Sequence, residues 1–173
     1  MAAEEEREDV QRRVNILRRA DMFYDLTDAQ LEMIASIASE AEYGMGEIIF
    51  RENSTGDELY VIAAGEVEIQ VDPGLIQPGG GQEGRPVTIT TLRRGQTFGE
   101  IALVDQGLRT ASARSASQRT RLLVIPRERL ITLCENYPEL GYRLMRNIAA
   151  DLAFKIRGTD LMIREQLLWR PRP

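Results

Sequence analysis

The sequence contains no histidine, one cysteine and one lysine in 173 residues. Histidine is the commonest general base and metal ligand in proteins, so its absence excludes Ser-His-Asp hydrolases and histidine-ligated zinc sites. The single cysteine, Cys134, cannot form a disulfide within the chain and stands in an apolar stretch, where it behaves as a small hydrophobic residue. We therefore expect no enzyme activity, no cofactor and no metal site, and a reducing, cytoplasmic location.

Long apolar runs and a surplus of basic residues are also missing. No run approaches the roughly 18 apolar residues of a membrane span, and the N-terminus is acidic where a signal peptide is basic. We therefore expect neither a membrane span nor secretion. The net charge of −5 disfavours a large nucleic-acid surface, because such surfaces neutralise phosphates with Lys and Arg. A single small anion can still bind locally.

The apolar content that is present suits one domain with helical flanks. The chain is 43% hydrophobic, and it is too short for two ordinary domains. Apolar residues among charges predict an amphipathic helix over residues 7–21. Thr27 and Gln30 match a capping box, which predicts a second, short helix carrying Leu31, Ile34 and Ala35 at helical spacing.

From about Tyr43 the apolar period changes to two, which predicts strands. Turn-forming residues separate the strands at short intervals, and further strands are expected at 87–89, 111–115 and 122–125. This spacing predicts an antiparallel sandwich flanked by helices. Residues 72–86 are rich in Gly and Pro, a composition that cannot hold regular structure, so we expect a mobile hairpin loop there.

The C-terminal part is predicted to be helical. Pro126 is expected to open a helix over 127–136, and a last helix begins near Pro138. If this helix continues to Trp169, it is long enough to protrude beyond the core. Gly158 lies inside it, where glycine costs about 1 kcal/mol relative to alanine. We interpret Gly158 as either a tolerated defect or a bending point.

The candidate site lies where a strand end, a glycine and a short apolar helical turn follow one another at 96–104. The free N–H groups at a helix start suit an anion, and Gly99 lets a ligand approach the backbone. Arg109 follows Glu100 by nine residues, so its guanidinium can fold back and hold two oxygens of the same anion. Glu100 fits beside an anion if its carboxylate accepts hydrogen bonds from ligand hydroxyls, such as those of a ribose.

The run Phe-Gly-Glu-Ile-Ala-Leu at 98–103, with Arg109, Thr110 and Ala111, resembles the phosphate-binding cassette of the cyclic-nucleotide-binding domain family. Residues 53–60 and 65–67 resemble a strand-turn-strand of that family's β-roll. The resemblance covers about 22–168, and it is specific because residue types, spacing and strand pattern match together. It implies a mainly β fold: a jelly-roll-like antiparallel β-sandwich with N-terminal helices and a long C-terminal helix, as in the sensor domains of catabolite activator protein and cyclic-nucleotide-dependent kinases.

The resemblance also implies the ligand, cAMP or cGMP, and the role of each site residue. Glu100 would bind the ribose 2′-hydroxyl, and Arg109 would pair with the cyclic phosphate. Thr110 matches a position that can reach a guanine amino group, but it does not decide between the two bases. Backbone contacts with the ligand are implied for Gly99, Ile101, Ala102 and Ala111. The ligand-binding set predicted in this way is Phe98, Gly99, Glu100, Ile101, Ala102, Arg109, Thr110 and Ala111.

The sequence departs from the family in two places. In addition, Glu100, Arg109 and Thr110 could each have a structural role instead of binding a ligand. Leu108 stands where the family often has proline, and the Gly-Pro loop at 72–86 is long but should not enter the pocket. Glu100 alone could be an exposed carboxylate at a helix start. Arg109 alone could be a surface cation or a partner of Glu100 or Asp105. Thr110 could simply be a strand residue, because it is β-branched.

The last helix has two expected uses. Its first half is predicted to pack on the sandwich, and its second half, with Leu161, Ile163 and Leu167, to pair with another copy in a homodimer. The family resemblance also implies that this helix caps the base, with Lys155, Arg157 or Thr159 as candidate contacts.

The resulting prediction is a cyclic nucleotide sensor whose C-terminal helices re-dock as a regulatory output. The alternatives are a ligand-free scaffold or dimerisation module, and the sensory fragment of a longer regulator. No helix-turn-helix fits after the last helix, so no nucleic acid is expected to bind this chain. The predicted segments are N-terminal helices at 1–39, the β-roll at 40–126 with its cassette at 98–111, lid and dimerisation helices at 127–169, and a tail at 170–173.

Overall fold

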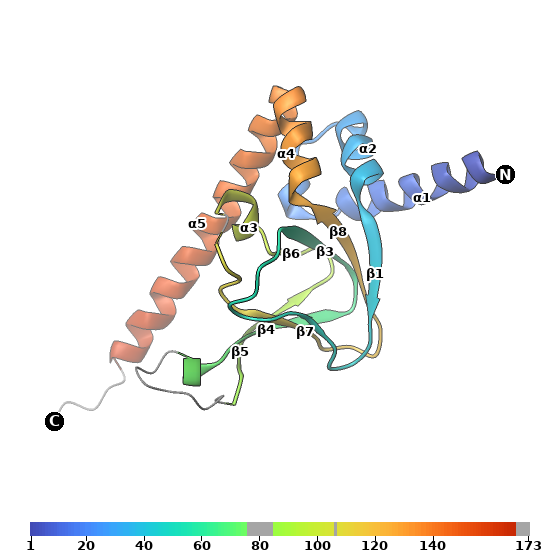
Figure 1. The fold of residues 1–173 in the computed structure, drawn as a ribbon. Coiled ribbons are helices and arrows are strands. Elements are labelled where there is room, and N and C mark those ends of the chain that lie inside the picture. The colour runs from blue at the N-terminus through green and yellow to red at the C-terminus, as the bar shows by residue number, and fades with distance from the viewer. Residues whose placement is uncertain (76–84, 106, 169–173) are drawn as a thin grey trace.

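The computed structural model describes residues 1–75, 85–105 and 107–168. Two antiparallel four-stranded sheets face each other, and helices gather on one side of them (Figure 1). The predicted fold class, an antiparallel β-sandwich with N-terminal helices and a long C-terminal helix, is therefore confirmed. The division into four segments is not decided by this architecture and stays a prediction.

One sheet has the strand order β1-β8-β3-β6 and the other the order β2-β7-β4-β5. The strands are β1 (Ser39–Tyr43), β2 (Ile48–Phe50), β3 (Glu58–Ala64), β4 (Glu66–Val71), β5 (Val87–Arg93), β6 (Thr97–Phe98), β7 (Ser112–Ser115) and β8 (Thr120–Pro126). Strands were predicted from about Tyr43 onward, but the first strand, β1, already begins at Ser39. Strand β1 is largely exposed, so it lacks the alternation of apolar residues that reveals the others.

The helices are α1 (Ala2–Leu17), α2 (Asp28–Ile37), α3 (Ile101–Val104), α4 (Arg127–Asn136) and α5 (Pro138–Leu168), with 3₁₀ turns at Asp21–Phe23 and Pro73–Leu75. The capping box at Thr27 and the bounds of α4 are confirmed. Helix α1, predicted over 7–21, begins and ends earlier, because residues 21–23 form a separate turn that buries Met22 and Phe23.

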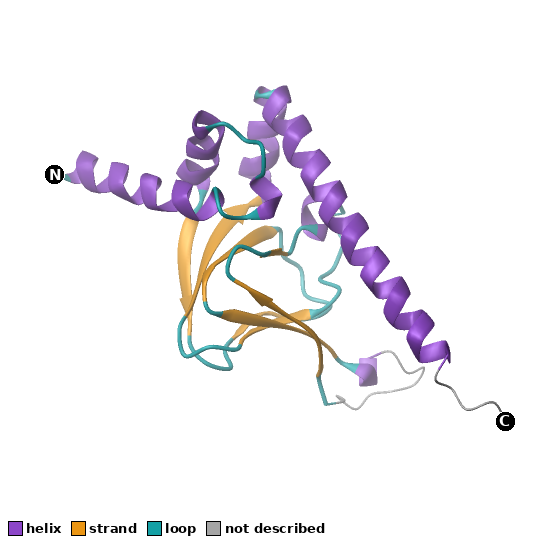
Figure 2. Ribbon diagram, turned by 180° about the vertical axis from the view of Figure 1, so that it is seen from behind, coloured by secondary structure: helices purple, strands orange, loops and turns teal. Residues whose placement is uncertain are grey.

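Strand β3 separates two apolar clusters, because its successive side chains point to opposite faces. Leu59 and Val61 pack with the helices, whereas Tyr60 and Ile62 pack between the two sheets. Helices α1, α2, α4 and α5 cover the outer face of the sheet that contains β3 and β8 (Figure 2). The space between the sheets is filled near β3 by Tyr60, Phe98 and their neighbours, which places the end of β6 beside the core.

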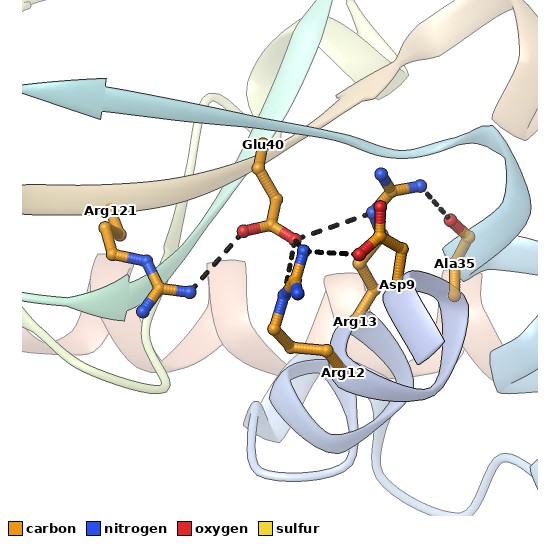
Figure 3. Close-up of polar contacts among 6 residues, drawn as sticks. All are labelled: Asp9, Arg12, Arg13, Ala35, Glu40 and Arg121. Atoms are coloured by element: carbon orange, nitrogen blue, oxygen red, sulfur yellow. Dashed lines mark hydrogen bonds and ion pairs between the residues drawn. The ribbon is translucent and has the colours of Figure 1, made fainter. Parts of the chain in front are cut away.

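An ion-pair cluster attaches α1 to the sheet. Figure 3 shows the Glu40 carboxylate on β1 facing Arg12 and Arg13 of α1 and Arg121 of β8. The shortest contact of Glu40 joins its Oε1 to Arg12 Nη2 at 3.0 Å, and Arg121 Nη2 lies 3.4 Å from Oε2. Because these side chains keep between 21% and 50% of their surface exposed, solvent screens the ion pairs, and the cluster orients α1 more than it stabilises the fold.

Helix α5 continues through Gly158 without a break and runs past the sheets (Figures 1 and 2). The interpretation of Gly158 as a bending point is therefore wrong. Within the described residues, no helix is both long and apolar enough to cross a bilayer.

The predicted Gly-Pro loop is described only in part. It does hold a short 3₁₀ turn at Pro73–Leu75, against the prediction of no regular structure. The expected mobility of 76–84, the helix end at Trp169 and the tail at 170–173 fall outside the described residues.

Candidate functional site

A cavity of about 760 Å³ lies between the β-roll and α5. All eight residues predicted to bind ligand line it, although they come from β6, α3 and the segment before β7. These residues differ in solvent exposure. Two of them, Ile101 and Thr110, are exposed, whereas five are buried: Phe98, Glu100, Ala102, Arg109 and Ala111. The fold thus brings the predicted set to one place.

The guanidinium of Arg109 is held rigidly at the base of this cavity. Its side chain is 4% exposed, and Nη2 donates to both the carbonyl and Oε2 of Glu58 at 3.1 Å. Nη1 lies 3.5 Å from the Gly99 carbonyl oxygen. The buried Nε has no hydrogen-bond partner among the described residues. Arg109 is therefore neither a surface cation nor a partner of Glu100 or Asp105.

An aromatic platform supports that guanidinium. The Cζ atom of Arg109 lies 4.3 Å from the ring centroid of Phe50, within the range of a cation–π contact. Phe50 packs on Tyr60 and Phe98, whose rings stack with centroids 4.9 Å apart. Burial, followed by the nearby Glu58 carboxylate, raises the pKa of Tyr60 to about 12, so the phenol stays neutral. The platform presents an uncharged surface to the cation.

Glu100 is connected to α5 by the only lysine of the chain. Lys155 Nζ donates to Glu100 Oε1 at 2.7 Å and lies 2.8 Å from Asp151 Oδ2. Burial lowers the pKa of Lys155, but the attraction of Glu100 and Asp151 outweighs it, so the pKa lies above its ordinary value. The Glu100 side chain is only 7% exposed, which contradicts the alternative of an exposed carboxylate. Its Oε2 accepts no hydrogen bond from any described residue.

The turn between β6 and α3 is built around Gly99. Its φ of +80° is a left-handed conformation, and an added Cβ would lie 2.7 Å from the Glu58 carbonyl oxygen and 2.8 Å from Arg109 Nη1. Within the described part of the chain, the backbone N–H groups of Gly99, Glu100 and Ile101 make no hydrogen bond, whereas that of Ala102 donates to the Gly99 carbonyl at 3.2 Å. The free donors therefore belong to the first part of the turn.

Two expectations change at the end of the segment. Thr110 is not a strand residue, because β7 begins at Ser112, and its exposed side chain borders the cavity. Ala111 also precedes β7, so the strand predicted at 111–115 begins one residue later than predicted, at Ser112. Lys155 and Thr159 line the cavity, but Arg157 is not among its lining residues.

Sequence reasoning missed the residues that hold Arg109. Glu58 and Phe50 were recognised only as parts of strands, because nothing local relates them to an arginine some fifty residues away. Among the described residues, no three His, Cys, Asp or Glu side chains converge as a metal site would require.

Comparison with known proteins identifies the family of this chain. Residues 40–137 match the family model of the cyclic nucleotide-binding domain. The chain belongs to the cyclic nucleotide-binding domain family. The Cyclic AMP receptor protein of Thermus thermophilus is 32% identical over 145 residues, which are 84% of this chain and 61% of that protein. A cGMP-dependent protein kinase of Drosophila melanogaster, isozyme 1, is 31% identical over 130 residues, 73% of this chain and 16% of the kinase.

Solved structures of cyclic nucleotide-binding domains share the fold. The crystal structure of the Thermus thermophilus Catabolite Activator Protein has a TM-score of 0.69 at 29% identity, covering 85% of this chain and 63% of that one. A cyclic nucleotide-binding domain from Methylobacillus flagellatus has a TM-score of 0.75 at 21% identity, covering 92% and 84%, and this shows the fold alone. The chain spans about three fifths of the length of the first curated relatives, 61% and 57%.

Proposed function

We propose that this chain is a cyclic nucleotide sensor that binds cAMP or cGMP in the cavity between the β-roll and α5. The observation that carries the proposal is Arg109, a buried cation whose Nε has no partner among the described residues. A buried, unsatisfied donor on a charged group is unfavourable, and an anion oxygen that accepts from Nε would remove that cost. A cyclic phosphate offers two such oxygens.

The surroundings of Arg109 support a ligand with a sugar as well as a phosphate. Glu58 and Phe50 fix the guanidinium in place, so little side-chain entropy is lost on binding. The free N–H groups of Gly99, Glu100 and Ile101 give further donors to the anion. Glu100 Oε1 is taken by Lys155, which leaves Oε2 to accept from a 2′-hydroxyl. Ala111 and Thr110 complete the proposed contact set, with Phe98 and Ala102 beneath it.

The output proposed for this sensor is the docking of α5. Lys155 connects the helix to Glu100, the same carboxylate that would bind the sugar, so ligand and helix meet at one group. A ligand that contacts both the cassette and α5 has different affinity for the docked and undocked states, as a population shift requires. We further propose that the second half of α5, residues 151–168, pairs with a second copy of the chain.

Calorimetric titration with cAMP and cGMP tests the binding proposal. We expect micromolar or tighter binding of at least one nucleotide, weakened about 100-fold or more by Arg109→Ala, because charged hydrogen bonds contribute about 1.5–3 kcal/mol each. Arg129→Ala is the matched control, since Arg129 is exposed on α4 and outside the cavity. Circular dichroism of each variant separates lost binding from lost folding. Failure of the unaltered protein to bind either nucleotide would contradict the proposal and leave the scaffold alternative.

A second titration isolates the sugar contact. Glu100→Gln is expected to weaken the ribonucleotide about 10-fold or more, because the neutral amide accepts a weaker hydrogen bond. The 2′-deoxy analogue should bind the unaltered protein and Glu100→Gln with similar affinity, since it lacks the hydroxyl. Equal losses for both ligands would mean that Glu100 acts through Lys155 and the turn rather than through the sugar.

A further inference from the structure

Gly158 is unexplained by the fold. A glycine inside a helix is unfavourable, yet α5 passes through Gly158 as a regular helix, so no bend requires it. A Cβ at this position would have no heavy atom of the described residues within 4 Å. No tight packing requires it either. Gly158 does line the cavity, and that is where its missing side chain has an effect.

The neighbours of Gly158 on the cavity face of α5 are large and exposed. Phe154 and Met162 lie four residues before and after it, and therefore on the same side of successive turns. Both line the cavity, with exposed fractions of 77% and 53%. Phe154 and Met162 are about 12 Å apart along the helix, and Gly158 leaves no side chain between them, with Lys155 and Thr159 lining the cavity beside it. The result is a slot with an aromatic ring at one end and a thioether at the other.

The wall that faces the slot is apolar too. Strands β4 and β5 contribute Ile69, Val71 and Ile89 to the same cavity, and Ile89 is 49% exposed. An apolar gap with walls on two sides suits a flat ring, which covers both walls at once and adds stacking on Phe154. The parts proposed to hold phosphate and sugar line the same cavity, and Lys155, three residues before Gly158, donates to Glu100 Oε1 at 2.7 Å. The slot thus adjoins the part proposed to hold the sugar.

We propose that Gly158 is a specificity-determining residue, which keeps open a slot between Phe154 and Met162 for the flat base of the bound nucleotide. The inference rests on the proposed function. It explains why the chain keeps a glycine that weakens its own helix, because any side chain at this position would project into the space that the base occupies. The size of that side chain, rather than its polarity, sets how much binding is lost.

Two substitutions test the slot by moving stability and affinity in opposite directions. Gly158→Ala should raise the melting temperature of the ligand-free protein, since alanine favours the helix, and should weaken binding a few-fold. Gly158→Leu should weaken binding at least 10-fold. Ala153→Leu is the matched control, because Ala153 is an exposed residue of the same helix outside the cavity and the change is also uncharged. It should bind the nucleotide as the unaltered protein does.

A base-free competitor, ribose 3′,5′-cyclic phosphate, shows which part of the ligand is affected. Its affinity should be the same for the unaltered protein and Gly158→Leu, while the nucleotide loses affinity. Equal losses for both would mean a blocked entrance and would overturn the slot, as would unchanged nucleotide binding by Gly158→Leu. A changed oligomeric state with normal binding would assign this face to a second copy and overturn it too. If the unaltered protein binds no nucleotide, the proposed function itself fails.

Discussion

The two halves of α5 have similar apolar content and very different surroundings. In the first half, residues 138–150, Leu140, Leu144 and Ile148 are each at most 1% exposed in the core beneath the β-roll. In the second half, residues 151–168, Phe154 is 77% exposed and Leu161 62%. One continuous helix thus has one part fixed by its own fold and another whose apolar side chains have little cover among the described residues.

The difference shows what apolar periodicity in a helix does and does not determine. Both halves carry large apolar residues at helical spacing, so both satisfy the same pattern. Only contacts with other elements distinguish a residue that stabilises the domain from one that is available to a ligand or a partner. The polar tether Lys155 lies close to the boundary between the halves.

The largest expected effect on stability comes from removing apolar volume in the buried half of α5. Leu144→Ala should lower the free energy of unfolding by about 2–5 kcal/mol, because it loses apolar contacts and leaves a cavity. Leu161→Ala, the same change in the exposed half, should stay within about 0.5 kcal/mol. Denaturant unfolding monitored by circular dichroism measures both. Similar losses for the two variants would show that Leu161 is buried as firmly as Leu144, on the domain or against a second copy.

The next effect concerns the proposed homodimer. Ile163, one of the residues predicted to pair, and Ile156, seven residues before it, lie on the side of α5 away from Phe154 and Met162 and are 50% and 62% exposed. Ile163→Asp should weaken self-association at least 10-fold, as measured by sedimentation equilibrium. Ala150→Asp, on an exposed position of the first half, is the control. A monomeric unaltered protein would contradict the proposal.

The smallest expected effect comes from removing the amine of Lys155, which connects α5 to Glu100. Lys155→Met should cost about 0.5–1 kcal/mol at most, since the lysine side chain is 37% exposed and solvent screens its ion pairs. Hydrogen exchange should show faster exchange in the second half of α5 and little change in the first.

The pH dependence of that effect follows from the raised pKa of Lys155. A raised pKa means that the contribution is fully present below the ordinary value of 10.5 and is lost only as pH rises through the higher folded value. The melting difference between Lys155→Met and the unaltered protein should therefore be equal at about pH 6 and about pH 9. A difference that disappears between these two conditions would show that another group is responsible.

Elements that depend on local interactions could be predicted from the sequence, whereas those that depend on distant pairings could not. The capping box at Thr27, the proline that opens α4 and the alternation in β3 are local rules, and the structure follows them. Strand β1 escaped prediction because it is exposed and is held by pairing with β8, which lies some eighty residues later. A pairing of that kind leaves no periodic signal in the strand itself.

The site shows the same division. The eight residues of the cassette were predicted from adjacent positions and a family resemblance, and the fold brings all of them to one cavity. Glu58, Phe50 and the slot at Gly158 depend on how β2, β3 and α5 meet, so they were not predicted. Gly158 was noticed in the sequence for its cost to the helix, and only the structure relates that cost to the cavity.

The pairing of Lys155 with Glu100 has a practical consequence for experiments on the proposed docking of α5. Lys155 carries the only side-chain amine of the chain, and it lies 2.7 Å from a carboxylate oxygen. A carbodiimide activates carboxylates and joins them to an amine without a spacer, releasing a urea. It would join Lys155 either to Glu100, which links α5 to the turn, or to Asp151 of the same helix, with no engineered cysteine. Peptide mass analysis would then show whether Lys155 is joined to Glu100, and hence whether α5 is fixed to the turn.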